Sequence, residues 1–118
     1  MEQVKCFTDA SYSQQKGLSV IGYKIGENEI VLDRLPGVKN TQAELVAIDR
    51  CISECNRLYS DNVLIIIHTD CQRALKNQYV GNVLVVKIKG HKKKVLRDED
   101  DAVFSTVDKA VRRMLRRS

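Results

Sequence analysis

Three acidic residues occupy positions where a soluble fold rarely places a charge. Asp9 lies within an apolar segment typical of a strand, and Asp70 closely follows the unbroken apolar run 63–67. Glu44 falls in the first turn of the clearest predicted helix, beside its apolar stripe. A buried carboxylate is costly unless it is paired or bound to a cation. If the helix packs across two neighbouring strands, we expect the three carboxylates to converge.

Converging carboxylates favour metal-ion chemistry. Their charges repel one another, and a divalent cation relieves that repulsion. Hard oxygen ligands select Mg²⁺ or Mn²⁺, and two such ions about 3.5–4 Å apart can activate water and stabilise the leaving oxygen of phosphodiester hydrolysis. The acids therefore indicate a small metal-dependent nuclease. Simpler roles stay open, because Glu44 can complete a capping box with Thr41 and Asp70 can cap the helix that follows it.

Hydropathy patterns predict the elements that must hold these acids. Strands alternate or run apolar, whereas helices repeat apolar residues every three or four positions. Strands are predicted over residues 4–11, 18–25, 29–35, 63–67 and 83–89, and helices over 41–58, 71–78 and 102–117. A meander followed by crossover helices predicts an α/β fold, in which a mixed sheet carries helices on its faces in the order β-β-β-α-β-α-β-α.

Length and composition fit a small intracellular protein. The 118 residues predict one domain spanning 1–118, and the net charge of +5 suits a polyanionic partner. No apolar run approaches the roughly 20 residues that span a bilayer, so no membrane association is expected. The four cysteines lack C-x-x-C spacing, which favours buried thiols over a zinc site. We expect a cytoplasmic protein, most simply a monomer.

Five short segments resemble motifs of the ribonuclease H family, in the family's order. Residues 7–11 (FTDAS) resemble its first-strand motif, and residues 40–45 (NTQAEL) resemble the segment that opens its main helix. Residues 68–72 (HTDCQ) resemble its "TD-S-Q" segment, with Cys in place of Ser. Residues 89–91 (KGH) and 107–111 (VDKAV) are similar to the auxiliary-histidine loop and the final-helix motif, the latter closest to the retroviral type. Each motif is weak alone, but five in order are specific.

The resemblance implies a ribonuclease H-like fold with a five-stranded mixed sheet. It implies cleavage of the RNA strand of an RNA–DNA hybrid, with two Mg²⁺ (or Mn²⁺) ions and 3′-hydroxyl and 5′-phosphate products. It further implies an auxiliary His91 that moves a proton or helps product leave. The implied metal ligands are Asp9, Glu44, Asp70 and Asp108, and the implied substrate contacts are Ser11, Asn40, Thr41 and Gln72.

The chain departs from the family pattern in two places that matter for function. The segment after Asp70 is very short, whereas bacterial relatives carry further helices there, including a basic handle that grips the hybrid. Lysines at 87, 89 and 92–94 and arginines at 112, 113, 116 and 117 are candidates to contact phosphates instead. The loop between His91 and Asp108 is long, so Asp101 is the alternative fourth ligand, although the acids at 98–101 can also be solvated.

Three functions compete at this point. The leading hypothesis is a hybrid-specific ribonuclease. A second keeps the metal chemistry but changes the substrate to structured RNA or DNA, and a third is a noncatalytic nucleic-acid-binding domain. Four mutually repelling carboxylates give a pure binder no advantage, which favours an enzyme. His68 shares a strand face with Asp70, and we interpret it as a hydrogen-bonded core histidine rather than a ligand.

Overall fold

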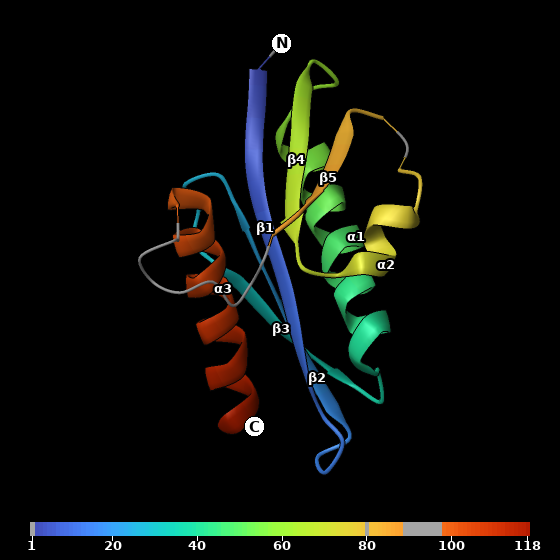
Figure 1. Ribbon diagram of the computed structural model, residues 1–118, viewed down its shortest axis with the longest axis vertical. Helices are drawn as coiled ribbons and strands as arrows, with labels where there is room; N and C mark the ends of the chain where they lie inside the picture. Colours follow the sequence, from blue (N-terminus) through green and yellow to red (C-terminus); the bar gives the residue numbers. More distant parts are fainter. Residues whose placement is uncertain (1, 80, 89–97) are drawn as a thin grey trace.

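The computed structural model describes residues 2–79, 81–88 and 98–118. The order of elements is the predicted one, β-β-β-α-β-α-β-α (Figure 1). In chain order they are β1 (Glu2–Ser13), β2 (Leu18–Ile25), β3 (Val31–Pro36), α1 (Asn40–Leu58), β4 (Val63–Thr69), α2 (Gln72–Lys76), β5 (Val83–Lys87) and α3 (Glu99–Arg116).

The five strands form one mixed sheet in the order β3-β2-β1-β4-β5. The first three strands are joined by tight turns, so β1–β2 and β2–β3 pair antiparallel. Parallel pairing needs a crossover connection, and α1 and α2 supply it before β4 and β5. The predicted α/β fold class and mixed sheet are therefore confirmed.

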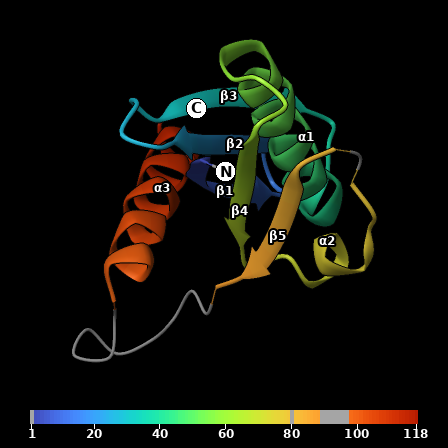
Figure 2. The ribbon, with the colours of Figure 1, turned by 90° about the horizontal axis from the view of Figure 1, so that it is seen from above.

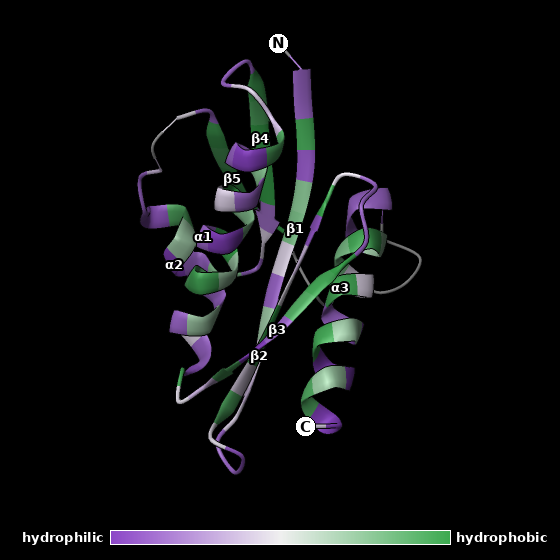
Figure 3. Ribbon diagram, turned by 180° about the vertical axis from the view of Figure 1, so that it is seen from behind, coloured by the Kyte–Doolittle hydropathy of each residue, from purple (hydrophilic) through white to green (hydrophobic). Residues whose placement is uncertain are grey.

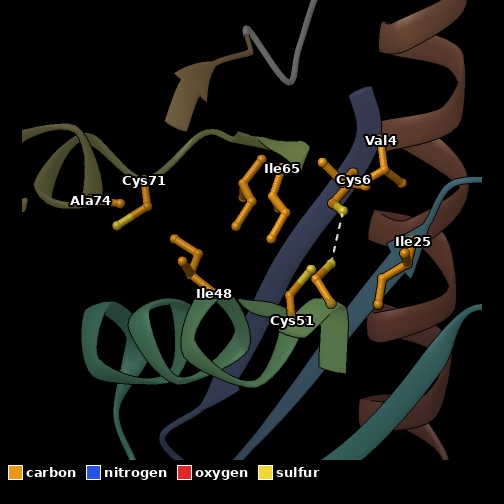
Figure 4. Close-up of a cluster of buried hydrophobic side chains, with 11 residues drawn as sticks. Val4, Cys6, Ile25, Ile48, Cys51, Ile65, Cys71 and Ala74 are labelled. Atoms are coloured by element: carbon orange, nitrogen blue, oxygen red, sulfur yellow. Dashed lines mark hydrogen bonds between the residues drawn. The ribbon is translucent and has the colours of Figure 1, made fainter. Parts of the chain in front are cut away.

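The helices cover both faces of the sheet, with α1 and α3 on opposite sides (Figure 2). Strand β1 serves both layers because its side chains alternate between the faces. Cys6 packs with Ile48 and Ile65 in the α1 core (Figure 4), whereas Phe7 packs with Val107 in the α3 core. All four cysteines are free and buried, as predicted from their spacing.

A glycine lets α3 approach the sheet closely. Gly22 on β2 is paired with Asp9 on β1. A Cβ atom at Gly22 would lie 2.6 Å from Cγ2 of Val111, well inside van der Waals contact. The missing side chain therefore fixes how near α3, and every residue on its inner side, can come to the middle of β1.

The observed helix ends differ from the predicted ones: α2 is shorter than the predicted 71–78, and the starts of α1 and α3 have different caps than expected. The predicted Thr41–Glu44 capping box is wrong, because α1 begins at Asn40 and its N-cap, Lys39, makes no side-chain cap. Helix α3 begins at Glu99, three residues earlier than predicted, because two acids cap it reciprocally: the Asp101 amide donates to Asp98 Oδ1 at 2.9 Å, and the Asp98 amide donates to Asp101 Oδ2 at 3.2 Å. None of the helices in the described part of the chain combines the length and the hydrophobicity of a membrane span.

Candidate active site

Three carboxylates from three different elements meet beside the end of β4. The parallel pairing of β1 with β4 ends at Phe7 opposite His68. Two residues further along, Asp9 and Asp70 follow at equivalent positions beyond the ladder, and Glu44 reaches the same point from the first turns of α1. One carboxylate oxygen from each acid lies within 4.8 Å of the other two. The convergence expected from the sequence is therefore present.

Burial and mutual repulsion raise the pKa values of two of these carboxyl groups above their ordinary range. Asp9 is only 5% exposed, and burial, a side-chain hydrogen bond with Asp108 and the charge of Asp70 together raise its pKa to about 9. Burial, followed by the charge of Asp70, raises the pKa of Glu44 to about 7. Burial disfavours the ionised form of each acid, and the neighbouring carboxylates add repulsion. A hard divalent cation would supply compensating positive charge, so the donor set fits Mg²⁺ or Mn²⁺.

A fourth acid joins the cluster from α3. The half-buried Asp108 forms the side-chain hydrogen bond that helps raise the pKa of Asp9. Its Oδ1 also accepts a hydrogen bond from Nε of Arg112 at 3.1 Å. Asp101, the alternative fourth ligand, instead lies in the capping box that begins the same helix. The structure therefore brings Asp108, on the inner side of α3, to the other acids.

The remaining predicted site residues surround this cluster or lie outside the described residues. Ser11 is half-buried on β1, on the same strand face as Asp9. Asn40 and Thr41 are exposed in the first turn of α1, about one turn before the proposed metal ligand on that helix, and Gln72 is exposed at the start of α2. His91 lies outside the described residues.

His68 is a structural residue of the α3 layer. It is buried, its Nδ1 lies 2.9 Å from the carbonyl oxygen of Cys6, and its ring stacks on Phe7 with centroids 4.5 Å apart. Its Nε2 is 3.7 Å from a carboxylate oxygen of Asp100. The interpretation of His68 as a hydrogen-bonded core histidine is confirmed.

Two residues that the sequence did not single out for this role shape the site. Arg112 was considered only as a phosphate contact, although its i, i+4 spacing from Asp108 was a signal for an ion pair. Gly22 carried no functional signal in the sequence, because its importance comes from the helix that packs over it. Both residues act through the position or charge of Asp108.

The sequence as a whole matches one protein family. The family model of RNase H matches residues 1–115. The chain belongs to the ribonuclease H family. Proteins of curated function include none with significant sequence similarity to it.

Solved structures show the same ribonuclease H fold. A ribonuclease H1 isolated from compost, in complex with an RNA/DNA hybrid, superposes with a TM-score of 0.66 at 14% identity, covering 95% of this chain and 99% of that one. The ribonuclease H1 of Halobacterium salinarum superposes with a TM-score of 0.68 at 14% identity, covering 98% of this chain and 99% of that one. The prototype foamy virus protease–reverse transcriptase gives 0.71 at 12% identity, covering 93% of this chain and 20% of that one.

Proposed function

We propose that this chain is an endonuclease that hydrolyses the RNA strand of RNA–DNA hybrids with divalent metal ions. The observation that carries the proposal is the meeting of Asp9, Glu44 and Asp70 within 4.8 Å on a ribonuclease H fold. A related ribonuclease H1 of the same fold has been crystallised with an RNA/DNA hybrid, which supports the choice of substrate.

The proposed chemistry assigns a separate task to each group of side chains. Asp9, Glu44, Asp70 and Asp108 would hold two Mg²⁺ or Mn²⁺ ions. Bound there, the ions would lower the pKa of an attacking water and stabilise the leaving oxygen. The negative charges of these carboxylates repel one another. The fold must therefore hold the ligands close together before a cation binds.

Substrate discrimination is proposed to come from the polar rim of the cluster. Asn40, Thr41 and Gln72 carry exposed amide or hydroxyl side chains, and Ser11 adds a further hydroxyl. Such groups can read 2′-hydroxyls across the shallow minor groove, which is how a protein separates RNA from DNA. His91 remains a proposed proton carrier or product-release residue.

The proposal is tested by a cleavage panel. A labelled RNA–DNA hybrid, double-stranded RNA, single-stranded RNA and double-stranded DNA are each incubated with Mg²⁺ or Mn²⁺. Cutting should be confined to the RNA of the hybrid. Asp70→Asn should lower the rate more than about 100-fold, because a ligand charge is removed from the metal site. Asp61→Asn makes the same chemical change at an exposed turn and should leave the rate unchanged.

The other two functions are alternative outcomes of the same panel. Cutting of another substrate that depends on Asp70 would establish a nuclease of different specificity. Binding without any cutting, sensitive to salt but not to Mg²⁺, would establish a nucleic-acid-binding domain. Cutting of the hybrid by Asp70→Asn at the full rate would refute the proposed site.

A further inference from the structure

A groove lined by arginines runs between α3 and β3, and the proposed metal site does not use it. Figure 3 shows the helix and the strand side by side. The cavity measures about 400 Å³, with an apolar floor and a cationic rim. The floor residues are Leu32, Ala110 and Met114, and the rim residues are Arg34, Arg113 and Arg117.

The three guanidinium groups are available to an anion. All three residues are exposed, and within the described part of the chain none of them forms an ion pair with a carboxylate. Arg34 donates from Nε to Ser118 Oγ at 2.8 Å, which leaves its other donors open. A cationic rim without internal counter-charge favours an anionic ligand.

The groove is a separate surface from the carboxylate cluster. Asp108 and Arg117 are nine residues apart, which is about two and a half turns of α-helix. They therefore lie on opposite sides of α3, with Asp108 toward Asp9 and Arg117 toward β3. A ligand in the groove would not touch the proposed metal ligands.

We propose that this α3–β3 groove binds single-stranded nucleic acid, with phosphates on the arginine rim and a base on the apolar floor. A single strand fits better than a duplex, because a duplex stacks its bases inside and would offer the floor only sugar and phosphate. Unstacked bases, in contrast, pack on apolar side chains and on guanidinium planes. The site goes beyond the proposed nuclease function and does not depend on it.

The test measures binding without cleavage. Fluorescence anisotropy follows a labelled oligothymidylate of about 15 nucleotides in EDTA, so neither metal binding nor hydrolysis contributes. The double variant Arg113→Ala/Arg117→Ala should weaken binding about tenfold at moderate salt. It should also lower the slope of log affinity against log salt by about 1.4, since two phosphate contacts on a single strand are lost.

A matched variant separates the groove from the general charge of the helix. Lys109 and Arg116 are exposed on α3 but do not line the groove. Lys109→Ala/Arg116→Ala removes the same two charges and should weaken binding less than about threefold. Met114→Gln keeps charge and length but makes the floor polar, and it should weaken binding about threefold without changing the salt slope. Circular dichroism melting confirms that each variant is folded.

Two results would overturn the proposal. If the two double variants lose the same amount of binding affinity, any positive charge on α3 attracts the oligonucleotide. Equal losses for the oligothymidylate and for a blunt DNA duplex would mean that the groove contacts phosphates without selecting single strands. Failure of the chain to cleave a hybrid would not change how these binding results are interpreted, because the binding assay contains no metal.

Discussion

At the scale of single residues, the positively charged side chain of Arg112 pairs with Asp108, which is a proposed metal ligand. At 3.1 Å from Nε to Oδ1, the two side chains form an ion pair within ordinary hydrogen-bond range. The two side chains are 52% and 27% exposed, so water screens the pair and its contribution to stability is small. Its importance is instead local, because Asp108 must exchange the guanidinium for an incoming metal ion.

We therefore predict that Arg112→Ala tightens metal binding. Loss of the competing cation should raise the affinity for Mn²⁺ about two- to fivefold, measured by isothermal titration calorimetry without substrate. Lys109→Ala is the control, because it removes one positive charge beside Asp108 from a side chain outside that ion pair. Weaker Mn²⁺ binding by Arg112→Ala than by the control would instead mean that Arg112 orients Asp108 for the metal.

The sequence showed some of the site residues more clearly than others. Asp9 and Asp70 stood out because each interrupts or ends an apolar strand, so their types and positions alone signalled a site. The choice between Asp108 and Asp101 could not be made that way, since Asp101 lies in the first turn of the final helix and Asp108 in its middle, and neither interrupts an apolar strand. Only the folded chain shows that Asp101 caps α3 while Asp108 contacts Asp9.

At the scale of elements, the close approach of α3 to β2 sets the position of Asp108. We predict that Gly22→Ala lowers the free energy of unfolding by about 1–3 kcal/mol, because its Cβ would lie 2.6 Å from Val111 Cγ2. The helix should move away from β1 and weaken Mn²⁺ binding. Urea unfolding and calorimetry measure the two effects.

A second substitution tests the cause of that effect. Val111→Ala alone should also destabilise the protein, because it removes buried methyl groups. Combined with Gly22→Ala, it removes the clashing atom, so the double variant should lose less stability than the two single changes together. If the losses of stability from the two substitutions simply add, Gly22 matters because of its backbone conformation, and α3 does not need the close contact.

The elements themselves were more predictable than their ends. Strand β2 was predicted over the residues it occupies, because its apolar and β-branched residues favour a pleated strand between two turns. Helix ends depend on a few side-chain oxygens, and an acidic residue can cap a helix or face water with the same sequence pattern. Asp98 is such a residue, and its capping role appears only once its partner Asp101 is placed.

At the scale of the whole molecule, charge of opposite sign is divided between the two sides of one helix. The inner side of α3 contributes Asp108 to a carboxylate cluster, and its outer side contributes Arg113 and Arg117 to the α3–β3 groove. In the described residues between α2 and β5, no helix stands where bacterial relatives carry a basic handle. We infer that a chain with a net charge of +5 can gain substrate affinity from α3 instead.

The carboxylate cluster also makes the stability of the metal-free protein depend on pH. The pKa values of Asp9 and Glu44 are raised to about 9 and about 7, above the roughly 4 of an unfolded chain. Below about pH 4 both carboxyl groups are protonated in the folded and in the unfolded chain, and neither opposes folding. As pH rises, the unfolded chain releases these protons first, so the free energy of unfolding falls, by at most about 1.4 kcal/mol per pH unit for each group.

We therefore predict that the metal-free protein becomes less stable from about pH 4.5 to pH 7 through both acids, and on toward pH 9 through Asp9 alone. Asp9→Asn should remove most of this fall and exceed the unsubstituted protein in stability at pH 8 by on the order of 2 kcal/mol, because asparagine removes the cost of keeping Asp9 protonated in the folded chain while the unfolded chain ionises. Saturating Mn²⁺ should reverse the ranking, since only the unsubstituted cluster keeps its full charge for the ion. Urea unfolding across this pH range, with EDTA or Mn²⁺, measures both effects. The same pH dependence in Asp9→Asn as in the unsubstituted protein would show that the cluster does not control stability.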